Sequence, residues 1–182
     1  NMKLSNKILI GFFGFIFLYL TAVFAEIRLR DTPNIVDDTN SIAESVDIPD
    51  VAYLVLHDLN ESVNVIGSDQ PRLEVRSISG NLLQKLNYNI SGDTLTLSQL
   101  HAEGVKTVKI TVFVPRSGLK GMTIDRGAAI VKGLEQERLY LSQNAGRISM
   151  SDNKILKIQI VASRRSYLDV SATELDTLSA NI

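Results

Sequence analysis

Only two side chains in the sequence could supply an imidazole for metal binding or acid–base catalysis, His57 and His101. His57 precedes Asp58 at the expected end of a strand, and His101 lies before Glu103 in a loop. A zinc site needs several ligands at regular spacing, and a Ser/His/Asp triad needs three groups that converge. The chain has no cysteine, and its acidic residues lack the alternating spacing of a calcium loop. We therefore predict no catalytic residue, no metal and no cofactor.

Three aspartates, Asp125, Asp152 and Asp169, fall at similar points of successive repeats and could line one face of a repetitive fold. Glycoside hydrolysis requires paired carboxylates at a suitable separation. Aspartate is also favoured in turns, where its carboxylate accepts hydrogen bonds from nearby backbone amides. The turn interpretation is the stronger one. We predict a non-enzymatic protein, with a polysaccharide-acting enzyme as an alternative.

The adjacent pair Arg164 and Arg165, with Arg147 about one repeat earlier, could form a small basic patch. Such a patch would suit an anionic glycan, a lipid headgroup or a protein partner. The competing interpretation is that these are solvated turn residues. We name Arg147, Arg164 and Arg165 as the expected partner surface. The net charge of −1 and the near-neutral body give no basis for nucleic-acid binding, which needs a basic face.

The elements that position these residues follow from an apolar repeat in the last third of the chain. The leading residues of the first series are Ile124, Leu141, Ile160 and Leu178, and those of the second are Ile130, Ile148 and Leu168. Steps of 17 to 20 residues suit coils of two short strands better than helical-pair repeats. Stacking such coils buries each series in a continuous column. We predict a parallel β-solenoid whose last visible coil is incomplete, so that further residues or a partner would cover it.

The segment before the repeats has the period-two alternation of β-strands. We expect strands over residues 51–57, 62–67, 72–77, 86–90, 94–98 and 108–114. Ser91–Asp93 should form a hairpin turn, Leu82–Lys85 one helical turn, and Pro115 should end the last strand. The body is therefore all-β.

The N-terminal stretch Ile8–Ala25 carries no charge over 18 residues and follows Lys3 and Lys7. Eighteen helical residues at about 1.5 Å each roughly match the hydrocarbon core of a bilayer. A retained signal anchor and a cleaved signal peptide both fit, and the aromatic content favours retention. The expected membrane-anchor residues are Ile8, Phe12, Phe13, Phe15, Phe17 and Leu20. We predict a single-pass inner-membrane protein whose C-terminal domain lies in the periplasm.

We predict three regions in the chain: a transmembrane helix over residues 1–25, a linker over 26–50 and a β-domain over 51–182. The linker is acidic and contains Pro33 and Pro49, which limit regular structure.

The order of segments in the β-domain resembles a known family. Val63–Gly67 precedes a turn, Gly92–Leu97 follows Leu83–Leu86, and Val108–Pro115 leads into Leu119–Ile124. This succession resembles the GIN domain, also named the "putative auto-transporter adhesin head domain". The resemblance implies a right-handed parallel β-solenoid in the envelope of Gram-negative bacteria, with a role in adhesion and no catalytic residues.

Two functions remain open from the sequence. In the first, the protein is a membrane-anchored periplasmic binding or adhesion-type module that contacts glycan or another envelope protein. In the second, it is an accessory structural subunit of an inner-membrane complex. The anchor helix would contact membrane lipid in either case.

Overall fold

A computed structural model describes residues 12–14, 16–17, 19, 21, 40–100, 108–163 and 165–181 of the chain. The chain divides into two units, Asn1–Ile35 and Val36–Ile182. In the first unit the described residues are helical, and the Thr21 hydroxyl donates a hydrogen bond to the Phe17 carbonyl at 2.7 Å. Phe12, Phe13 and Phe17 are exposed, whereas the other expected anchor residues, Ile8, Phe15 and Leu20, lie outside the described residues.

Among the residues described, no helix is long and apolar enough to span a membrane. A span requires about 20 consecutive apolar helical residues. The predicted single-pass inner-membrane location, with a periplasmic C-terminal domain, is therefore not supported, and we withdraw it.

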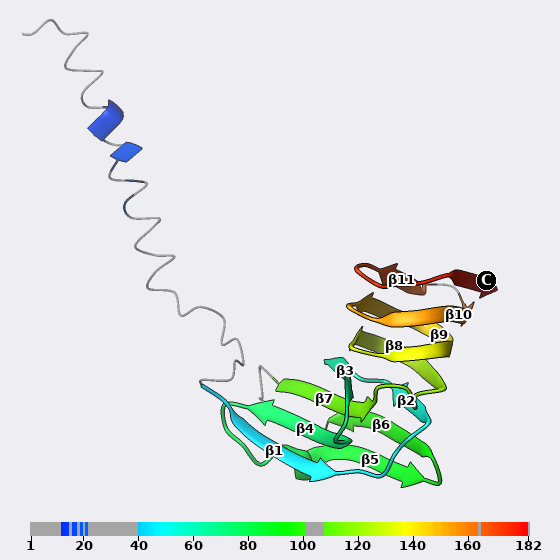
Figure 1. Cartoon of the computed structure of the whole chain (residues 1–182). Coiled ribbons are helices and arrows are strands. Elements are labelled where there is room, and N and C mark those ends of the chain that lie inside the picture. Colours follow the sequence, from blue (N-terminus) through cyan, green and yellow to red (C-terminus); the bar gives the residue numbers. More distant parts are fainter. Residues whose placement is uncertain are drawn as a thin grey trace, which may run out of the picture. The chain divides into compact units, whose positions relative to one another are not determined.

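The second unit is built from β-strands, as the sequence predicts (Figure 1). The strands and the single 3₁₀ turn are β1 (Ile42–Asp47), β2 (Tyr53–His57), β3 (Ser62–Ser68), β4 (Arg72–Ser77), η1 (Leu83–Lys85), β5 (Leu86–Ser91), β6 (Thr94–Leu100), β7 (Val108–Pro115), β8 (Gly121–Lys132), β9 (Glu135–Ser151), β10 (Lys154–Ala162), β11 (Tyr167–Val170) and β12 (Thr177–Asn181). The hairpin at Gly92, the helical turn and the end of β7 at Pro115 confirm their predictions. β1 is a correction: it lies within the expected linker, yet it pairs along its whole length with β4.

All strands belong to one mixed sheet rather than to a purely parallel one. β1, β4 and β7 pair antiparallel, as do β5 and β6, whereas β2, β3 and β8–β12 pair parallel to their neighbours. The first half of β8 pairs with β2 and its second half with β3. Likewise the first half of β9 pairs with β10 and its second half with β11. β8 and β9 therefore each run along two sides of the unit.

The corner between these two sides is made by residues with left-handed backbone conformation at equivalent positions. Asp58, Arg126 and Ala145 have φ values of 54°, 55° and 53°. Backbone hydrogen bonds join the corners after β2 and within β8. The Asp58 N–H donates to the Asp125 carbonyl at 2.8 Å, and the Leu59 N–H donates to the Arg126 carbonyl at 3.2 Å. Few residues other than glycine adopt this conformation without cost. The repeated corner therefore sets the point at which successive strands change direction.

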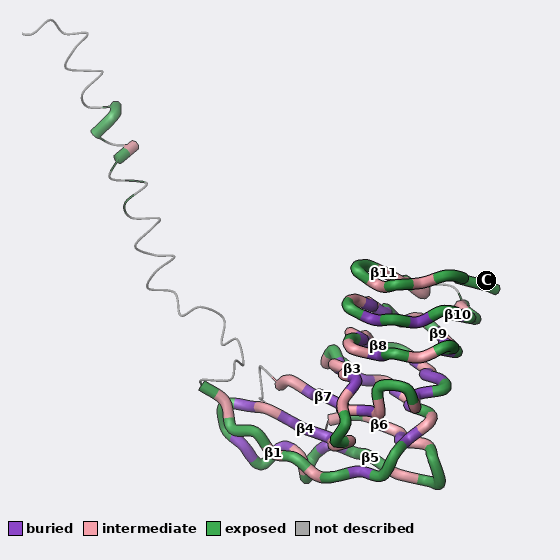
Figure 2. The backbone as a smooth tube through the Cα atoms, in the orientation of Figure 1, coloured by how far each residue is buried: buried purple, intermediate pink, exposed green. Residues whose placement is uncertain are grey.

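Apolar side chains from both sides of the unit point into its core and stack from one strand to the next. Figure 2 shows these buried positions alternating with exposed ones along the backbone. On one side the column runs through Leu95, Leu54, Met122, Leu141 and Ile160, each at most 3% exposed. On the other side it runs through Val63, Ala129, Ile148 and Leu168. The predicted pairs Leu141–Ile160 and Ile148–Leu168 are therefore confirmed.

Three members of the predicted series occupy other positions. Ile124 pairs with Gln143 rather than Leu141, and Leu178 pairs with Ile158 rather than Ile160. Both shifts are by two residues, so Ile124 still faces inward and is 0% exposed. Ile130 is shifted by one residue, because Ile148 pairs with Ala129. A shift of one residue moves a side chain to the opposite face of a sheet.

Candidate functional site

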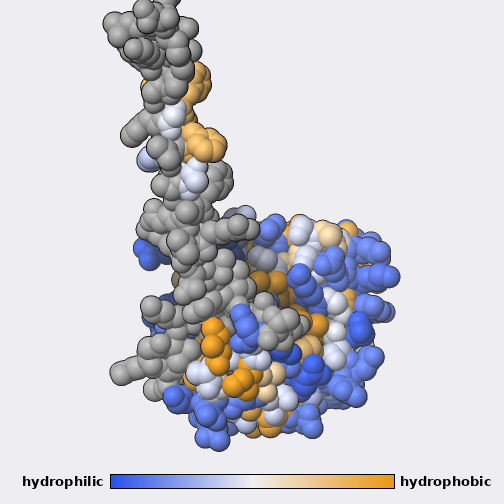
Figure 3. Space-filling model, turned by 90° about the vertical axis from the view of Figure 1, so that its left-hand side faces the viewer, coloured by the Kyte–Doolittle hydropathy of each residue, from blue (hydrophilic) through white to orange (hydrophobic). Residues whose placement is uncertain are grey.

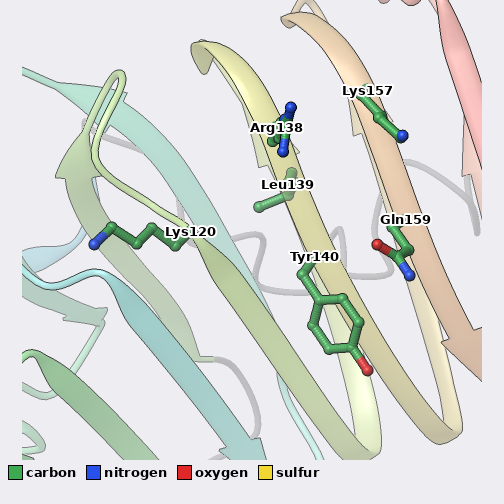
Figure 4. A pocket seen from close by; sticks show the side chains of 6 residues that line it. All are labelled: Lys120, Arg138, Leu139, Tyr140, Lys157 and Gln159. Atoms are coloured by element: carbon green, nitrogen blue, oxygen red, sulfur yellow. The ribbon is translucent and has the colours of Figure 1, made fainter.

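Figure 4 shows two cations, Arg138 and Lys157, side by side on adjacent strands, and a third, Lys120, whose side chain extends away from them. Lys120 directly precedes β8, Arg138 is in β9 and Lys157 is in β10. Arg138 and Lys157 are register partners, and the Lys120 carbonyl accepts a hydrogen bond from the Tyr140 N–H at 3.0 Å. Because neighbouring strands are about 4.8 Å apart, the sheet holds Arg138 and Lys157 close together at a fixed spacing.

These cations line a shallow hollow together with Leu139, Tyr140 and Gln159, and its volume is about 180 Å³. A second, wider hollow of about 440 Å³ shares Lys120 and Arg138 and also contains Glu135 and Glu137. The first hollow is smaller than the usual 300–1,000 Å³ of a drug-sized ligand pocket. It suits a single ring or charged group of a larger ligand that lies on the surface.

The cationic charge of the first hollow is not neutralised within the part of the chain that the structure describes. No ion pair joins Lys120, Arg138 or Lys157 to a carboxylate there, and no acidic residue lines the hollow. Four other arginines, Arg72, Arg76, Arg116 and Arg126, lie close to carboxylates, and Arg76 Nε is 2.6 Å from the buried Glu74. Unpaired guanidinium and ammonium groups form charge-assisted hydrogen bonds with carboxylate or phosphate. The hollow is therefore suited to an anion.

Two tyrosines lie beside these cations on the same side of the sheet. Tyr53 in β2 and Tyr140 in β9 are the register partners of Gly121, which lies between them in β8. Each tyrosine is 42% exposed. A Cβ atom at Gly121 would approach Tyr53 Cδ1 to 3.1 Å, so the Tyr53 ring occupies the space above the glycine. The result is a surface with two accessible aromatic rings next to three cations that have no ion-pair partner among the described residues. We refer to Lys120, Arg138, Tyr140, Lys157 and Gln159, with Tyr53, as the cationic–aromatic site.

A row of polar side chains runs along the same side near the left-handed corner. His57 Nδ1 lies 2.9 Å from Asp125 Oδ2, and Asn144 Nδ2 donates to Asp125 Oδ1 at 2.9 Å. The Ser163 hydroxyl then donates to Asn144 Oδ1 at 2.8 Å. The row thus connects β2, β8 and β9 with the residue that follows β10.

The contact between His57 and Asp125 is one that spacing in the sequence does not reveal. Ser98 is the register partner of His57 on β6, so the three residue types of a catalytic triad are neighbours. A triad also needs a hydrogen bond from the serine hydroxyl to the imidazole. No such bond is among those of the described residues, and none of the three hollows lined by Lys120, by Glu137 or by Asp69 includes His57, Ser98 or Asp125. We interpret the row as a link between strands.

Two of the residues expected to form a partner surface, Arg147 and Arg165, do not line this hollow. Arg147 lies in the second half of β9, where its guanidinium carbon is 4.5 Å from the centre of the Tyr167 ring. Arg165 is in the exposed turn between β10 and β11, with a φ of 67°. Arg164 lies outside the described residues. The prediction that these arginines contact a partner stays a prediction.

The three aspartates proposed as possible carboxylate partners occupy different parts of the unit. Asp125 pairs with Asn144 near the left-handed corner, Asp152 is in the turn between β9 and β10, and Asp169 is on β11 opposite Ser149. The register therefore does not align them along one face. No group of three potential metal-ligating residues occurs in the described part of the chain, and His101 lies outside it.

The comparison with known proteins establishes similarity of fold only. No protein-family model and no curated protein sequence matches the chain. The crystal structure of a "putative lipid binding protein" from Parabacteroides distasonis ATCC 8503 is similar, with a TM-score of 0.56 and 18% identity over 81% of this chain. This chain spans 65% of that protein's length. A "putative adhesin" from the same organism has a TM-score of 0.43 and 11% identity, over 81% of this chain and 80% of that chain.

One signal in the sequence could have revealed the cationic–aromatic site. Arg138 and Lys157 are 19 positions apart, which is the period of the apolar column through Met122, Leu141 and Ile160, and Lys120 is 18 positions before Arg138. Applying the period to charged residues as well as to apolar ones would have placed Arg138 beside Lys157, with Lys120 one residue out of register.

Proposed function

We propose that this protein is a non-enzymatic, adhesion-type binding module whose binding surface is the cationic–aromatic site. The observation that carries the proposal is the set of three cations on successive strands, unpaired in the described structure and next to accessible tyrosine rings. A broad sheet with a shallow charged hollow suits contact with a large ligand on its surface better than enclosure of a small substrate.

The likeness to a crystal structure named a "putative lipid binding protein" is compatible with a binding role, although it extends to fold alone. We further propose that the stacked parallel strands are coils of a right-handed β-solenoid of the GIN type. In support of this, register partners in β8, β9 and β10 are offset by 19 residues along the chain. Solution of a crystal structure would test the handedness.

The functional proposal can be tested with two matched double variants of the full chain. Arg138→Ala/Lys157→Ala removes two charges from the site, whereas Lys85→Ala/Lys132→Ala removes two exposed charges elsewhere. Both should retain the far-UV circular dichroism of the parent, because all four side chains are exposed. Binding would be measured by surface plasmon resonance to a panel of purified polysaccharides, matrix proteins and vesicles.

We expect the parent chain to bind at least one member of the panel. Arg138→Ala/Lys157→Ala should weaken this binding, and Lys85→Ala/Lys132→Ala should not. Equal binding by the two variants across the panel would overturn the assignment of the binding surface. Turnover of a panel polysaccharide by the parent chain, detected as new reducing ends, would overturn the non-enzymatic assignment.

A further inference from the structure

We infer that the ligand of the cationic–aromatic site is a linear acidic polysaccharide that crosses strands β8, β9 and β10 and carries one carboxylate on each sugar. This inference rests on the proposed function, because it names the ligand class of the same surface. It follows from the spacing of the cations, the exposure of the rings and the polarity of the hollow.

Two of the three cations repeat with the spacing of the sheet. Arg138 and Lys157 are direct register partners on adjacent strands, and their backbones are about 4.8 Å apart. Lys120 lies beside β9 on its other side, through the hydrogen bond from Tyr140 N–H to its carbonyl. One sugar in a linear chain advances by a length comparable to this strand spacing. A chain that runs across the strands would therefore bring successive carboxylates to Arg138 and Lys157, and Lys120 lies one residue out of this register beside β9.

The second row of the site supplies groups that fit the sugar rings themselves. Tyr140 and Gln159 are register partners, two residues beyond the Arg138–Lys157 pair along the strands (Figure 4). The exposed face of a tyrosine can stack on the apolar C–H face of a pyranose, and its hydroxyl remains available for hydrogen bonding. The Gln159 amide can both donate to and accept from sugar hydroxyls. Gly121 adds no side chain beside Tyr140, and the Tyr53 ring occupies the space above it, so that a second ring lies next to Tyr140.

An acidic polysaccharide fits the site better than a lipid headgroup does. A bilayer surface is bound through an apolar face inserted among the lipids together with basic residues around it. Leu139 is the only aliphatic residue that lines the hollow, and it is 1% exposed. Figure 3 shows hydrophilic side chains over much of another side of the unit, with hydrophobic patches among them. The hollow itself offers no aliphatic surface to insert into a membrane.

The experiment compares ligands that differ in one property, using the full chain. Polygalacturonate carries one carboxylate on each sugar, and its methyl ester has the same backbone without the charge. Vesicles of phosphatidylglycerol test a lipid phosphate, and vesicles of phosphatidylcholine report any binding by the rest of the chain. Affinity for each would be measured by isothermal titration calorimetry or vesicle sedimentation.

We expect the parent to bind polygalacturonate and not its methyl ester, with affinity that falls as salt is added because the charges are exposed. Arg138→Ala/Lys157→Ala should lower the affinity about tenfold, whereas Lys85→Ala/Lys132→Ala should change it less than about twofold. Tyr140→Ala should weaken binding, and Tyr140→Phe should restore most of it because the ring face is retained.

The outcomes separate this inference from the proposed function. Binding to phosphatidylglycerol vesicles that depends on Arg138 and Lys157, without binding to polygalacturonate, would overturn the inference and leave the binding surface intact. Equal affinity for polygalacturonate and its ester would show that carboxylates are not recognised. Binding of polygalacturonate that both double variants weaken equally would overturn both proposals, since the site would not be where the ligand binds.

Discussion

The substitution Asn153→Asp tests the packing of the strands most directly, because Asn153 is a polar side chain only 2% exposed in the core. Its Oδ1 accepts a hydrogen bond from the Leu134 N–H at 3.0 Å. Its Nδ2 donates to the carbonyl oxygens of Val131 and Ser151, each at 3.0 Å. One side-chain amide therefore links the end of β8 to the end of β9.

The substitution keeps the size and the acceptor but replaces the donating nitrogen of Asn153 with an oxygen. The carbonyls of Val131 and Ser151 then lose their donor, and a buried polar group left unsatisfied costs about 1–3 kcal/mol. Two such groups cost about 2–6 kcal/mol together, and a carboxylate without a charge partner adds to the cost. We expect the free energy of unfolding to fall by at least about 3 kcal/mol, a large part of the roughly 5–15 kcal/mol of a typical domain.

The assay is urea unfolding followed by far-UV circular dichroism, since the chain has no tryptophan for fluorescence. The matched control is Asn87→Asp, which makes the same chemical change at an exposed position of β5. The control should alter the free energy of unfolding by no more than about 0.5 kcal/mol. A loss below about 1 kcal/mol for Asn153→Asp would refute the reasoning, because it would mean that water reaches the two carbonyls.

Three further substitutions test other parts of the unit. Gly67→Ala should destabilise by about 1–3 kcal/mol or more, because the new Cβ would overlap the Gly133 carbonyl, whose carbon would lie 2.6 Å away; an unchanged melting temperature would contradict this close approach. Ile148→Asp should abolish cooperative unfolding, since Ile148 is 0% exposed and an unpaired charge there costs several kcal/mol; retained cooperativity would show that the column is wrong. Arg165→Ala in the exposed turn should change stability by at most about 0.5 kcal/mol, measured by urea unfolding, and a larger loss would indicate contacts that the described structure lacks.

The site was less predictable from the sequence than the fold. Arg164 and Arg165 are conspicuous because they are adjacent in the chain, but adjacency does not concentrate charge on one side of a sheet. Lys120, Arg138 and Lys157 are inconspicuous one by one, and parallel pairing brings them together. The same pairing places His57 beside Asp125, although they are far apart in the sequence. Contacts of this kind depend on which residues of neighbouring strands pair. The spacing of apolar residues in the sequence predicts that register only to within one or two residues.

The expected linker over residues 26–50 shows that composition also has a limited power to predict structure. The range 26–50 has an acidic composition and two prolines, which are properties of a solvated spacer. Ile42–Asp47 nevertheless forms β1, because the edge of β4 offers unpaired backbone groups along its length. Composition describes what a segment prefers alone, and the partner strand decides the outcome.

The sequence by itself determined that the body is all-β, where most strands lie and that the last third repeats with a period near 19 residues. These are consequences of local alternation and of turn residues, which act over a few positions. Only the tertiary structure decided the register, which paired Ile148 with Ala129 and turned Ile130 outward. The physical reason is that the left-handed corners at Arg126 and Ala145 fix how many residues separate equivalent positions in successive strands. A difference of one residue in that length exchanges the buried and exposed faces of a strand.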